Sequence, residues 1–289
     1  MKFVSVDTGE IIDIASYKTM KQLTTEENDL KDSNQRKKLY EVIRKELGGF
    51  YFLQYNKLLD TLENDTATAF RFLYLCSYSD KDGYIYTYNS KKCSSYTDFT
   101  FIFDRTRSTV TDFVKAMEKH NLVYKIDDCY VVNTQYYSMN INSQTFKTNS
   151  IRTFNNAIRE LYKNSNPKEH SLIGEILKLV PYINISNNIL CWNNEAVRSD
   201  DIIPLTLAEI RGILRPNSDY GRKLTNKIEK LTIKGEPVFG KFDSLGNPHY
   251  VINPRLFYRG NNIDQLKGLI DQFDVTKNKR KWGINKWKH

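Results

Sequence analysis

The chain has 289 residues, of which 40% are hydrophobic, and it carries a formal net charge of +9 at pH 7. This length accommodates two domains of ordinary size or one large one, and the basic balance favours a polyanionic partner. No run of about 18 apolar residues occurs, which argues against a transmembrane helix, and the first residues are too polar for a signal peptide. We therefore expect a cytoplasmic protein without a membrane partner.

Residues 1–38 are predicted to form a small hairpin followed by a polar segment. The runs "FVSV" and "IIDI" flank "DTGE", in which Gly9 supplies the turn. Residues 15–38 balance Lys and Arg against Asp and Glu, a composition typical of a loop.

Residues 39–144 are predicted to form a first module. A helix that includes Leu39 and Leu47 ends at two glycines. A helix "TATAFRFLYLCSYS", a strand "YIYTY" and a short helix "YTDFTFIFD" follow. The next helix, "RTRSTVTDFVKAMEKHNL", has apolar residues at i, i+3, i+4 and i+7 and Ser108 or Thr109 as its cap. The run "VYKI-DD-CYVV" then predicts a hairpin with a two-residue turn.

Residues 145–166 are predicted to be a linker helix. Ile151, Phe154, Ile158 and Leu161 place one apolar stripe on a helix of about 14 residues. This stripe packs the two modules together or pairs with a second subunit in a homodimer.

Residues 167–262 are predicted to repeat the order of the first module. The runs are "SLIGEILKLV" (helix), "NNILCW" (strand), "LTLAEIRGILR" (helix), "SDYGRKLTNKIEKL" (helix) and "PVFGKFDSLGNPHYVIN" (hairpin).

Residues 263–289 are predicted to be a C-terminal helix and a basic tail. From Val275 on, the tail holds six cations and no acid, interrupted by Trp282 and Trp287.

The order helix, strand, helix, helix, hairpin is that of a winged helix, in which the third helix enters the major groove. We therefore predict an α+β chain with two tandem winged-helix domains. On this interpretation "YVVN" at Tyr130 and "YVIN" at Tyr250 are the last strands of two wings.

The predicted reading helices and wings provide the candidate DNA contacts. Arg and Asn suit the base edges of guanine and adenine, whereas Lys and Thr more often hold phosphates. The alternative is an ordinary solvated helix face. The candidates are Arg105, Arg107, Thr109, Thr111 and Lys115 in the first module; Arg215, Arg222, Lys223, Asn226, Lys227 and Lys230 in the second; Lys125 and Lys241 in the wings; and Lys279, Arg280 and Lys281 in the tail.

Motifs for catalysis and metal binding are absent from the sequence. It contains no P-loop, no H-E-x-x-H and no H-x-H, and its four histidines are far apart. The four cysteines include no CxxC pair, so we expect them to be reduced. We expect no catalytic residues, no cofactor, no metal and no enzymatic activity.

Two stretches resemble the RepL family of plasmid replication proteins. They are "RTRSTVTDFVKAMEKHNLV" followed by a wing, and "YVINPRLFYRGN" after the second wing; the opening "FVSVDTGEIID" is also similar to the start of those proteins. The tandem layout is similar to that of iteron-binding plasmid initiators. The similarity to these initiators implies a winged-helix protein in which the first module serves dimer contacts and the second contacts the origin.

These patterns favour a sequence-specific double-stranded DNA-binding protein that initiates replication of a plasmid or phage. A transcriptional regulator, such as a repressor on operator DNA, is the alternative, because it uses the same binding physics. Iterated repeats beside an AT-rich stretch would favour initiation, and one palindrome over a promoter would favour repression. Winged helices that bind a host replication or transcription protein form a third class. The cation-rich second reading helix disfavours that class.

Overall fold

The computed structural model describes residues 43–63, 65–139, 150–215, 226–244, 247–260, 262 and 264–274, with 2–4, 11–13 and separate positions between 29 and 41. The chain forms two compact units, Met1–Val42 and Ile43–His289. In the first unit, β1 (Lys2–Val4) pairs antiparallel with β2 (Ile11–Asp13), which is the expected hairpin. The described positions between 29 and 41 are helical instead of forming a loop. The Lys, Gln and Glu side chains among them are good helix formers.

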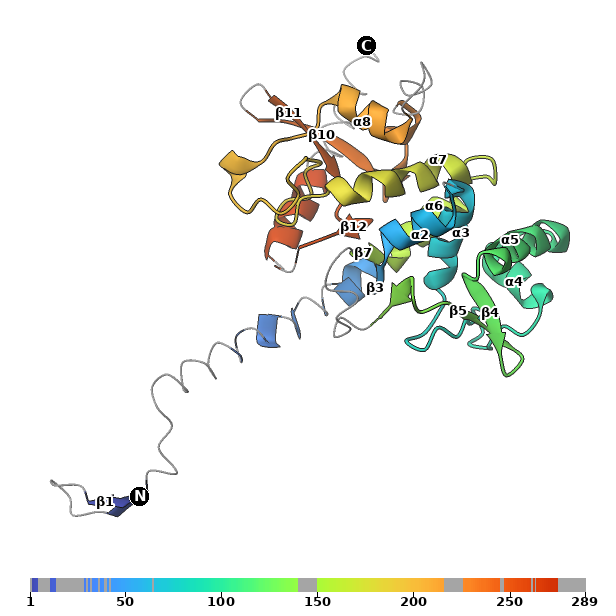
Figure 1. Cartoon of the computed structure of the whole chain (residues 1–289), viewed down its shortest axis with the longest axis horizontal. Helices are drawn as coiled ribbons and strands as arrows, with labels where there is room; N and C mark the ends of the chain where they lie inside the picture. The colour runs from blue at the N-terminus through green and yellow to red at the C-terminus, as the bar shows by residue number, and fades with distance from the viewer. Residues whose placement is uncertain are drawn as a thin grey trace, which may run out of the picture. The chain divides into compact units, whose positions relative to one another are not determined.

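The second unit mixes helices and strands, as an α+β chain should, and repeats one order of elements (Figure 1). The first half, residues 50–138, contains β3 (Phe50–Leu53), α2 (Tyr55–Thr61), α3 (Thr66–Cys76), α4 (Tyr96–Phe103), α5 (Arg107–Lys119), β4 (Val123–Ile126), β5 (Cys129–Val132) and β6 (Tyr137–Ser138).

The second half, residues 151–258, follows the same plan with an added hairpin, β8–β9. It contains β7 (Ile151–Phe154), α6 (Asn155–Lys163), α7 (His170–Gly174), η4 (Glu175–Tyr182), η5 (Ser199–Asp201), α8 (Leu207–Leu214), β8 (Thr232–Ile233), β9 (Glu236–Pro237), β10 (Phe239–Ser244), β11 (Asn247–Ile252) and β12 (Phe257–Tyr258). The π-helix η2 (Ile43–Leu47) precedes the first half, and residues 264–274 form a helix after the second. No helix in the described part of the chain has the length and apolar character needed to cross a membrane.

One four-stranded antiparallel sheet joins the two halves. Its order is β12-β7-β3-β6, so each half supplies two strands and β3 pairs with β7 at the centre. Phe52 pairs with Ser138 in the first half, and Arg152 pairs with Tyr258 in the second. Phe52 and Arg152 also pair with each other. An approximate two-fold axis therefore passes between these two residues and relates the halves.

Backbone hydrogen bonds outside the sheet follow the same symmetry. The Gln54 N–H donates to the Tyr136 carbonyl at 2.9 Å, and the Phe154 N–H donates to the Leu256 carbonyl at 3.2 Å. From the first pair to the second, the donor shifts by 100 residues and the acceptor by 120. The same two shifts carry Phe52–Ser138 onto Arg152–Tyr258. The repeat is thus present in local geometry although the two sequences differ.

Strand β7 occupies part of the segment predicted to be a linker helix. Ile151–Phe154 is a strand and α6 begins at Asn155, so the predicted helix is wrong over its first residues. Both edges of β7 are paired, with β3 and with β12, and its residues are buried. Ile, Thr and Phe suit a buried strand, and this preference overrides their helical spacing with Ile158 and Leu161. Those two side chains are buried within the chain itself.

Helices α3 and α7 cross where the halves meet. The Thr66 hydroxyl lies 3.0 Å from both the carbonyl and the hydroxyl oxygen of Ser171. A Cβ added at Gly174 would lie 1.9 Å from the Thr66 carbonyl oxygen, so only glycine permits this approach.

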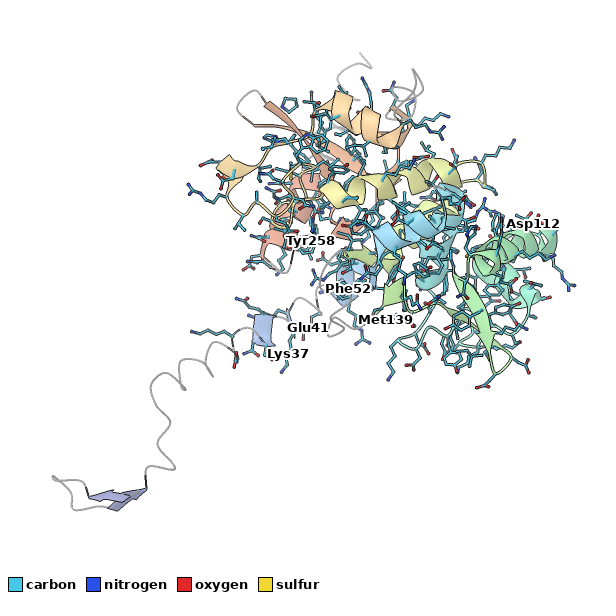
Figure 2. The ribbon with its side chains drawn as sticks, in the orientation of Figure 1. Lys37, Glu41, Phe52, Asp112, Met139 and Tyr258 are labelled. Atoms are coloured by element: carbon cyan, nitrogen blue, oxygen red, sulfur yellow. The ribbon has the colours of Figure 1, made fainter. Side chains whose placement is uncertain are left out.

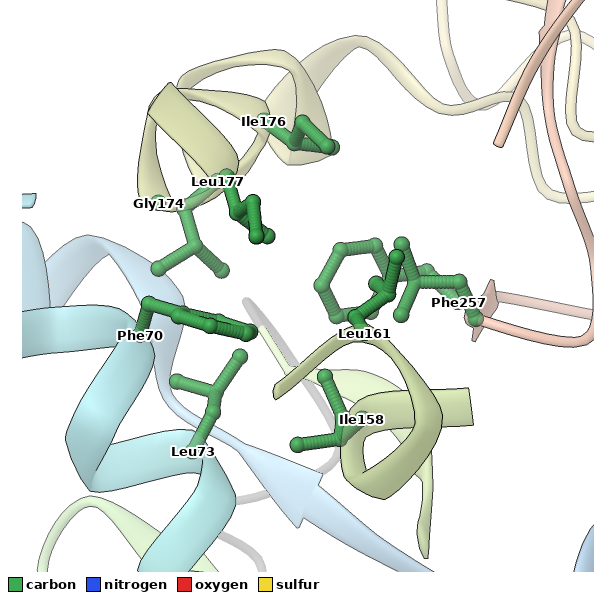
Figure 3. Close-up of a pocket in the computed structure, with 10 residues that line it drawn as sticks. Phe70, Leu73, Ile158, Leu161, Gly174, Ile176, Leu177 and Phe257 are labelled. Carbon is green, nitrogen blue, oxygen red and sulfur yellow. The ribbon is translucent and has the colours of Figure 1, made fainter. Parts of the chain in front are cut away.

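Apolar side chains from both halves surround a small cavity at this crossing. Figure 3 shows Phe70 of α3 facing Leu177 of η4, with Leu161 of α6 and Phe257 of β12 closing the other side. All four side chains are almost fully buried. The halves therefore share one hydrophobic core.

Candidate nucleic-acid interface

The first hairpin is closed at its base by Asn133. Its side-chain amide donates to the Asn121 carbonyl at 2.8 Å, and its side-chain oxygen accepts the Gln135 N–H at 3.0 Å. Its backbone N–H donates to the Leu122 carbonyl at 2.8 Å. One buried side chain thus holds the start of β4 and the turn after β5 together.

Asn253 makes the same contacts in the second hairpin. Its amide donates to the Pro237 carbonyl at 3.0 Å, its side-chain oxygen accepts the Arg255 N–H at 2.9 Å, and its backbone N–H donates to the Val238 carbonyl at 2.9 Å. The asparagine that ends "YVVN" and "YVIN" therefore has one structural task in both halves.

A third extended segment pairs with the inner strand of each hairpin. Tyr84 bridges Val131 in the first half, and Ile189 bridges Val251 in the second. The residue before each bridge has a positive φ, and it is a residue type that tolerates this conformation: Gly83 at 86° and Asn188 at 56°.

Capping boxes begin the helix that follows in each half. Ser95 and Asp98 cap α4, and Thr206 and Glu209 cap α8, with each side chain bonded to the other's backbone N–H. Burial alone would raise the pKa of Asp98. Hydrogen bonds from Ser94, Lys91 and Ser95 outweigh burial and hold that pKa well below its usual range. Helix α4 in turn packs against α5.

Helix α5 is amphipathic, and its polar face is exposed in the described part of the chain. Val110, Phe113, Val114 and Met117 are buried, as their spacing predicts. Ser108, Asp112, Lys115 and Lys119 are exposed at three- and four-residue intervals, so they lie on one face. Asp112 lies at the edge of the second unit in Figure 2 and is exposed, whereas Phe52 and Tyr258 are buried.

Several predicted residues stand at the start of α5. Arg107 is exposed, and its carbonyl accepts a hydrogen bond from the Thr111 hydroxyl at 2.8 Å. The N-cap is Thr106 and makes no side-chain cap bond, so the predicted caps, Ser108 and Thr109, are wrong. The Thr109 hydroxyl lies 3.0 Å from that of Thr106.

Strands β4 and β5 form the expected hairpin beside α5. Asp127 and Asp128 both have positive φ, 47° and 61°, which gives the two-residue turn that suits the twist of a hairpin. Lys125 is exposed on β4, where its ammonium donates to the Ser94 carbonyl at 2.9 Å and lies 4.8 Å from the centre of the Tyr130 ring.

Arg105 belongs to the contact between the halves rather than to the polar face of α5. Its guanidinium donates to the carbonyls of Asp104 and Ser165, at 2.8 and 3.2 Å, and lies 5.8 Å from the centre of the Tyr162 ring. The sequence gives no sign of this role, because Ser165 is 60 residues away.

Part of the candidate set in the second half lies in the described region. Arg215 is exposed, and its guanidinium lies 3.4 Å from the Glu175 carboxylate. Residues 226–228 are helical, with Ile228 buried and Asn226 and Lys227 exposed. Lys230 and Lys241 are also exposed. Arg222, Lys223, Lys279, Arg280 and Lys281 lie outside the described residues.

Three exposed residues of the α5 face were not among the sequence candidates: Ser108, Asp112 and Lys119. The signal for them was present. The apolar spacing that begins at Val110 fixes the buried face, and these three residues fall opposite it.

Comparison of the chain with models of protein families, with curated proteins and with solved structures found no match.

Proposed function

We propose that this protein binds double-stranded DNA sequence-specifically through two winged-helix modules, and that it is a replication initiator of a plasmid or phage. The first half supplies one module and the second half the other. Helix α5 is the reading helix of the first module, and the helical residues 226–228 belong to that of the second.

The observation that carries this proposal is the repeated arrangement of a capped helix and a three-segment wing whose base is closed by asparagine. In the first half, the helix α5 beside this wing keeps a whole polar face exposed. An exposed polar helix face beside a hairpin is the arrangement with which a winged helix contacts DNA. The net charge of +9 agrees with a phosphate-rich partner.

Each group on the α5 face suits one kind of contact. The Arg107 guanidinium can donate two parallel hydrogen bonds to guanine O6 and N7, and the Asp112 carboxylate can accept one from cytosine N4. Lys115 and Lys119 suit phosphates, which fix the register of the helix in the groove. Arg105 is excluded from this set because its guanidinium is held by two carbonyls.

The alternative hypothesis is a transcriptional regulator of a plasmid or phage. The arrangement of the bound DNA sites distinguishes the two hypotheses. Selection from a random duplex pool would supply the binding sequence. Several copies of that sequence near an AT-rich stretch would support initiation, whereas one copy over a promoter would support regulation.

The DNA-binding proposal is tested with the full chain and the selected duplex, by fluorescence anisotropy at several salt concentrations. Lys115→Ala should lower the salt dependence by about 0.9 in the slope of log K against log salt. Arg107→Ala should weaken binding to the selected site by roughly 1–3 kcal/mol while sparing random duplex. Lys163→Ala, an exposed lysine on α6, is the matched control. A pool that yields no enriched sequence, or equal effects of all three substitutions, would reject the proposal.

A further inference from the structure

The large hydrophobic side chains exposed in the described part of the second unit are concentrated in few places. Two lie on β4, and the others form two groups, which we name patch A and patch B. Patch A consists of Tyr88 and Phe101, 67% and 53% exposed, with Lys91 and Lys92. Patch B consists of Trp192, Val197 and Ile203, 50%, 77% and 58% exposed, with Asp200 and Asp201.

Each patch has a defined local structure. The Tyr88 and Phe101 rings of patch A meet edge to face, 6.0 Å apart. In patch B the Trp192 N–H donates to the Ile203 carbonyl at 3.0 Å, and the indole N–H donates to Glu209 at 2.9 Å. The side chains of Tyr88, Phe101 and Trp192 are thus held in place by the fold.

The two patches occupy equivalent places in the repeat. Patch A lies on the segment between Tyr84 and the capping box of α4, together with α4 itself. Patch B lies on the segment between Ile189 and the capping box of α8. A backbone hydrogen bond closes the base of each segment in the same way. The Cys93 N–H donates to the Ile85 carbonyl at 2.9 Å, and the Leu205 N–H donates to the Leu190 carbonyl at 2.8 Å.

The charges of the patches are opposite. Residues 86–101 contain Lys91, Lys92 and one acid, Asp98, which forms an ion pair with Lys91 at 3.0 Å; Lys92 makes no ion pair within the described residues. Residues 192–206 contain three acids, Glu195, Asp200 and Asp201, and one cation, Arg198. Glu195 pairs with Arg259. Asp200 and Asp201 make no ion pair within the described residues, and both are exposed.

We propose that patch A of one copy binds patch B of a second copy, so that the protein self-associates head to tail. In Figure 1, α4 and the loop before it lie at the right of the second unit, and the gold segment before α8 lies at the left. The two patches of one chain therefore cannot cover each other. Apolar side chains at the centre and opposite charges around them are the composition of a protein interface. A contact between two different patches leaves one of each free, so the assembly can extend.

Charge reversal tests this contact by sedimentation of the full chain without DNA. The variant K92E makes both patches acidic while it leaves the Lys91–Asp98 ion pair intact, and D200K/D201K makes both basic. Each variant alone should associate at least about tenfold more weakly than the natural chain, because like charges then face each other. An equal mixture of the two variants should recover association, since opposite patches meet again.

Two further variants keep the test decisive. K163E/K168E reverses two exposed lysines elsewhere, a charge change at least as large as that of either variant, and should leave association unchanged. Val197→Ser removes the most exposed apolar side chain of patch B without altering charge, and it should weaken association. The proposal is overturned if the natural chain stays monomeric at about 100 μM, where a micromolar contact would be occupied. It is also overturned if the mixture of folded reversal variants fails to recover association.

Discussion

A single buried asparagine at the base of each hairpin shows how one residue determines the shape of a hairpin. Asn133 and Asn253 each use donor and acceptor atoms of one side chain to hold two separate backbone segments. Alanine would remove both hydrogen bonds and leave buried backbone groups without partners. A serine or a threonine is too short to span the same two groups.

Asn133→Ala should therefore lower the free energy of unfolding by about 1–3 kcal/mol, and Asn253→Ala by a similar amount. Urea unfolding followed by circular dichroism measures both. Asn89→Ala, at an exposed turn position, is the control and should change stability by less than about 0.5 kcal/mol. Equal losses in all three variants would show that the hairpin contacts are not special.

His170 is a buried residue that must stay neutral. The Arg71 guanidinium donates to its Nδ1 at 3.1 Å, and the rings of Phe70 and Tyr162 lie 5.4 and 4.8 Å from its ring. Burial, with the nearby charges of Arg71 and Arg105, lowers the pKa of His170 to about 3. The unfolded chain therefore binds a proton near pH 6.5 that the folded chain does not.

We expect the contribution of His170 to stability to be complete above about pH 6.5 and to be lost progressively as the pH falls toward 3. The free energy of unfolding, measured from pH 7 to pH 4, should fall more steeply for the natural chain than for His170→Gln. Parallel curves for the natural chain and His170→Gln would contradict this account.

At the scale of elements, the capping boxes of α4 and α8 allow a comparison within one chain. The Asp98 carboxylate is buried and accepts the backbone N–H groups of Ser94 and Ser95 at 3.0 and 2.9 Å. Glu209 accepts from Thr206 at 2.7 Å in a more open setting. The same motif thus has different surroundings in the two halves.

Asp98→Ala should cost about 1–3 kcal/mol in the free energy of unfolding, because it leaves buried N–H groups without acceptors. Glu209→Ala should cost less, since water can replace its carboxylate. Because the pKa of Asp98 is lowered in the fold, its contribution should be present above the pKa of the unfolded carboxyl group and disappear at more acidic pH. Urea unfolding of both variants at pH 7 compares the two losses in the free energy of unfolding. A larger loss for Glu209→Ala than for Asp98→Ala would contradict this expectation.

Sequence patterns within a few residues predict most of the helices and hairpins, but they do not predict which distant segments pair with each other. The spacing of Val110, Phe113 and Met117 predicts α5, and "VYKI-DD-CYVV" predicts its hairpin, because these signals lie within a few residues. Strand β7 was missed because its partners, β3 and β12, lie about a hundred residues away on either side. Arg105 was assigned to DNA for the same reason: its partner Ser165 is distant in sequence.

At the scale of the whole molecule, the two halves are too closely joined to behave as independent modules. The central pairing of β3 with β7 crosses the two-fold axis, and α3 meets α7 beside it. Side chains from both halves line the cavity around Phe70 and Phe257. A break at this junction should therefore affect α5 in one half and the β10–β11 hairpin in the other together.

Gly174→Ala tests this coupling, because the added methyl group would lie 1.9 Å from the Thr66 carbonyl and force α3 and α7 apart. We expect a loss of more than about 2 kcal/mol, as for other overpacked core positions. Gly212→Ala, at a helical glycine on α8 with open space around it, is the control and should be neutral or stabilising. Amide hydrogen exchange should show the α5 and β10–β11 amides losing protection by the same factor in Gly174→Ala, since one cooperative unit opens as a whole. Loss confined to the second half would mean that the halves unfold separately and that the shared sheet contributes little to holding them together.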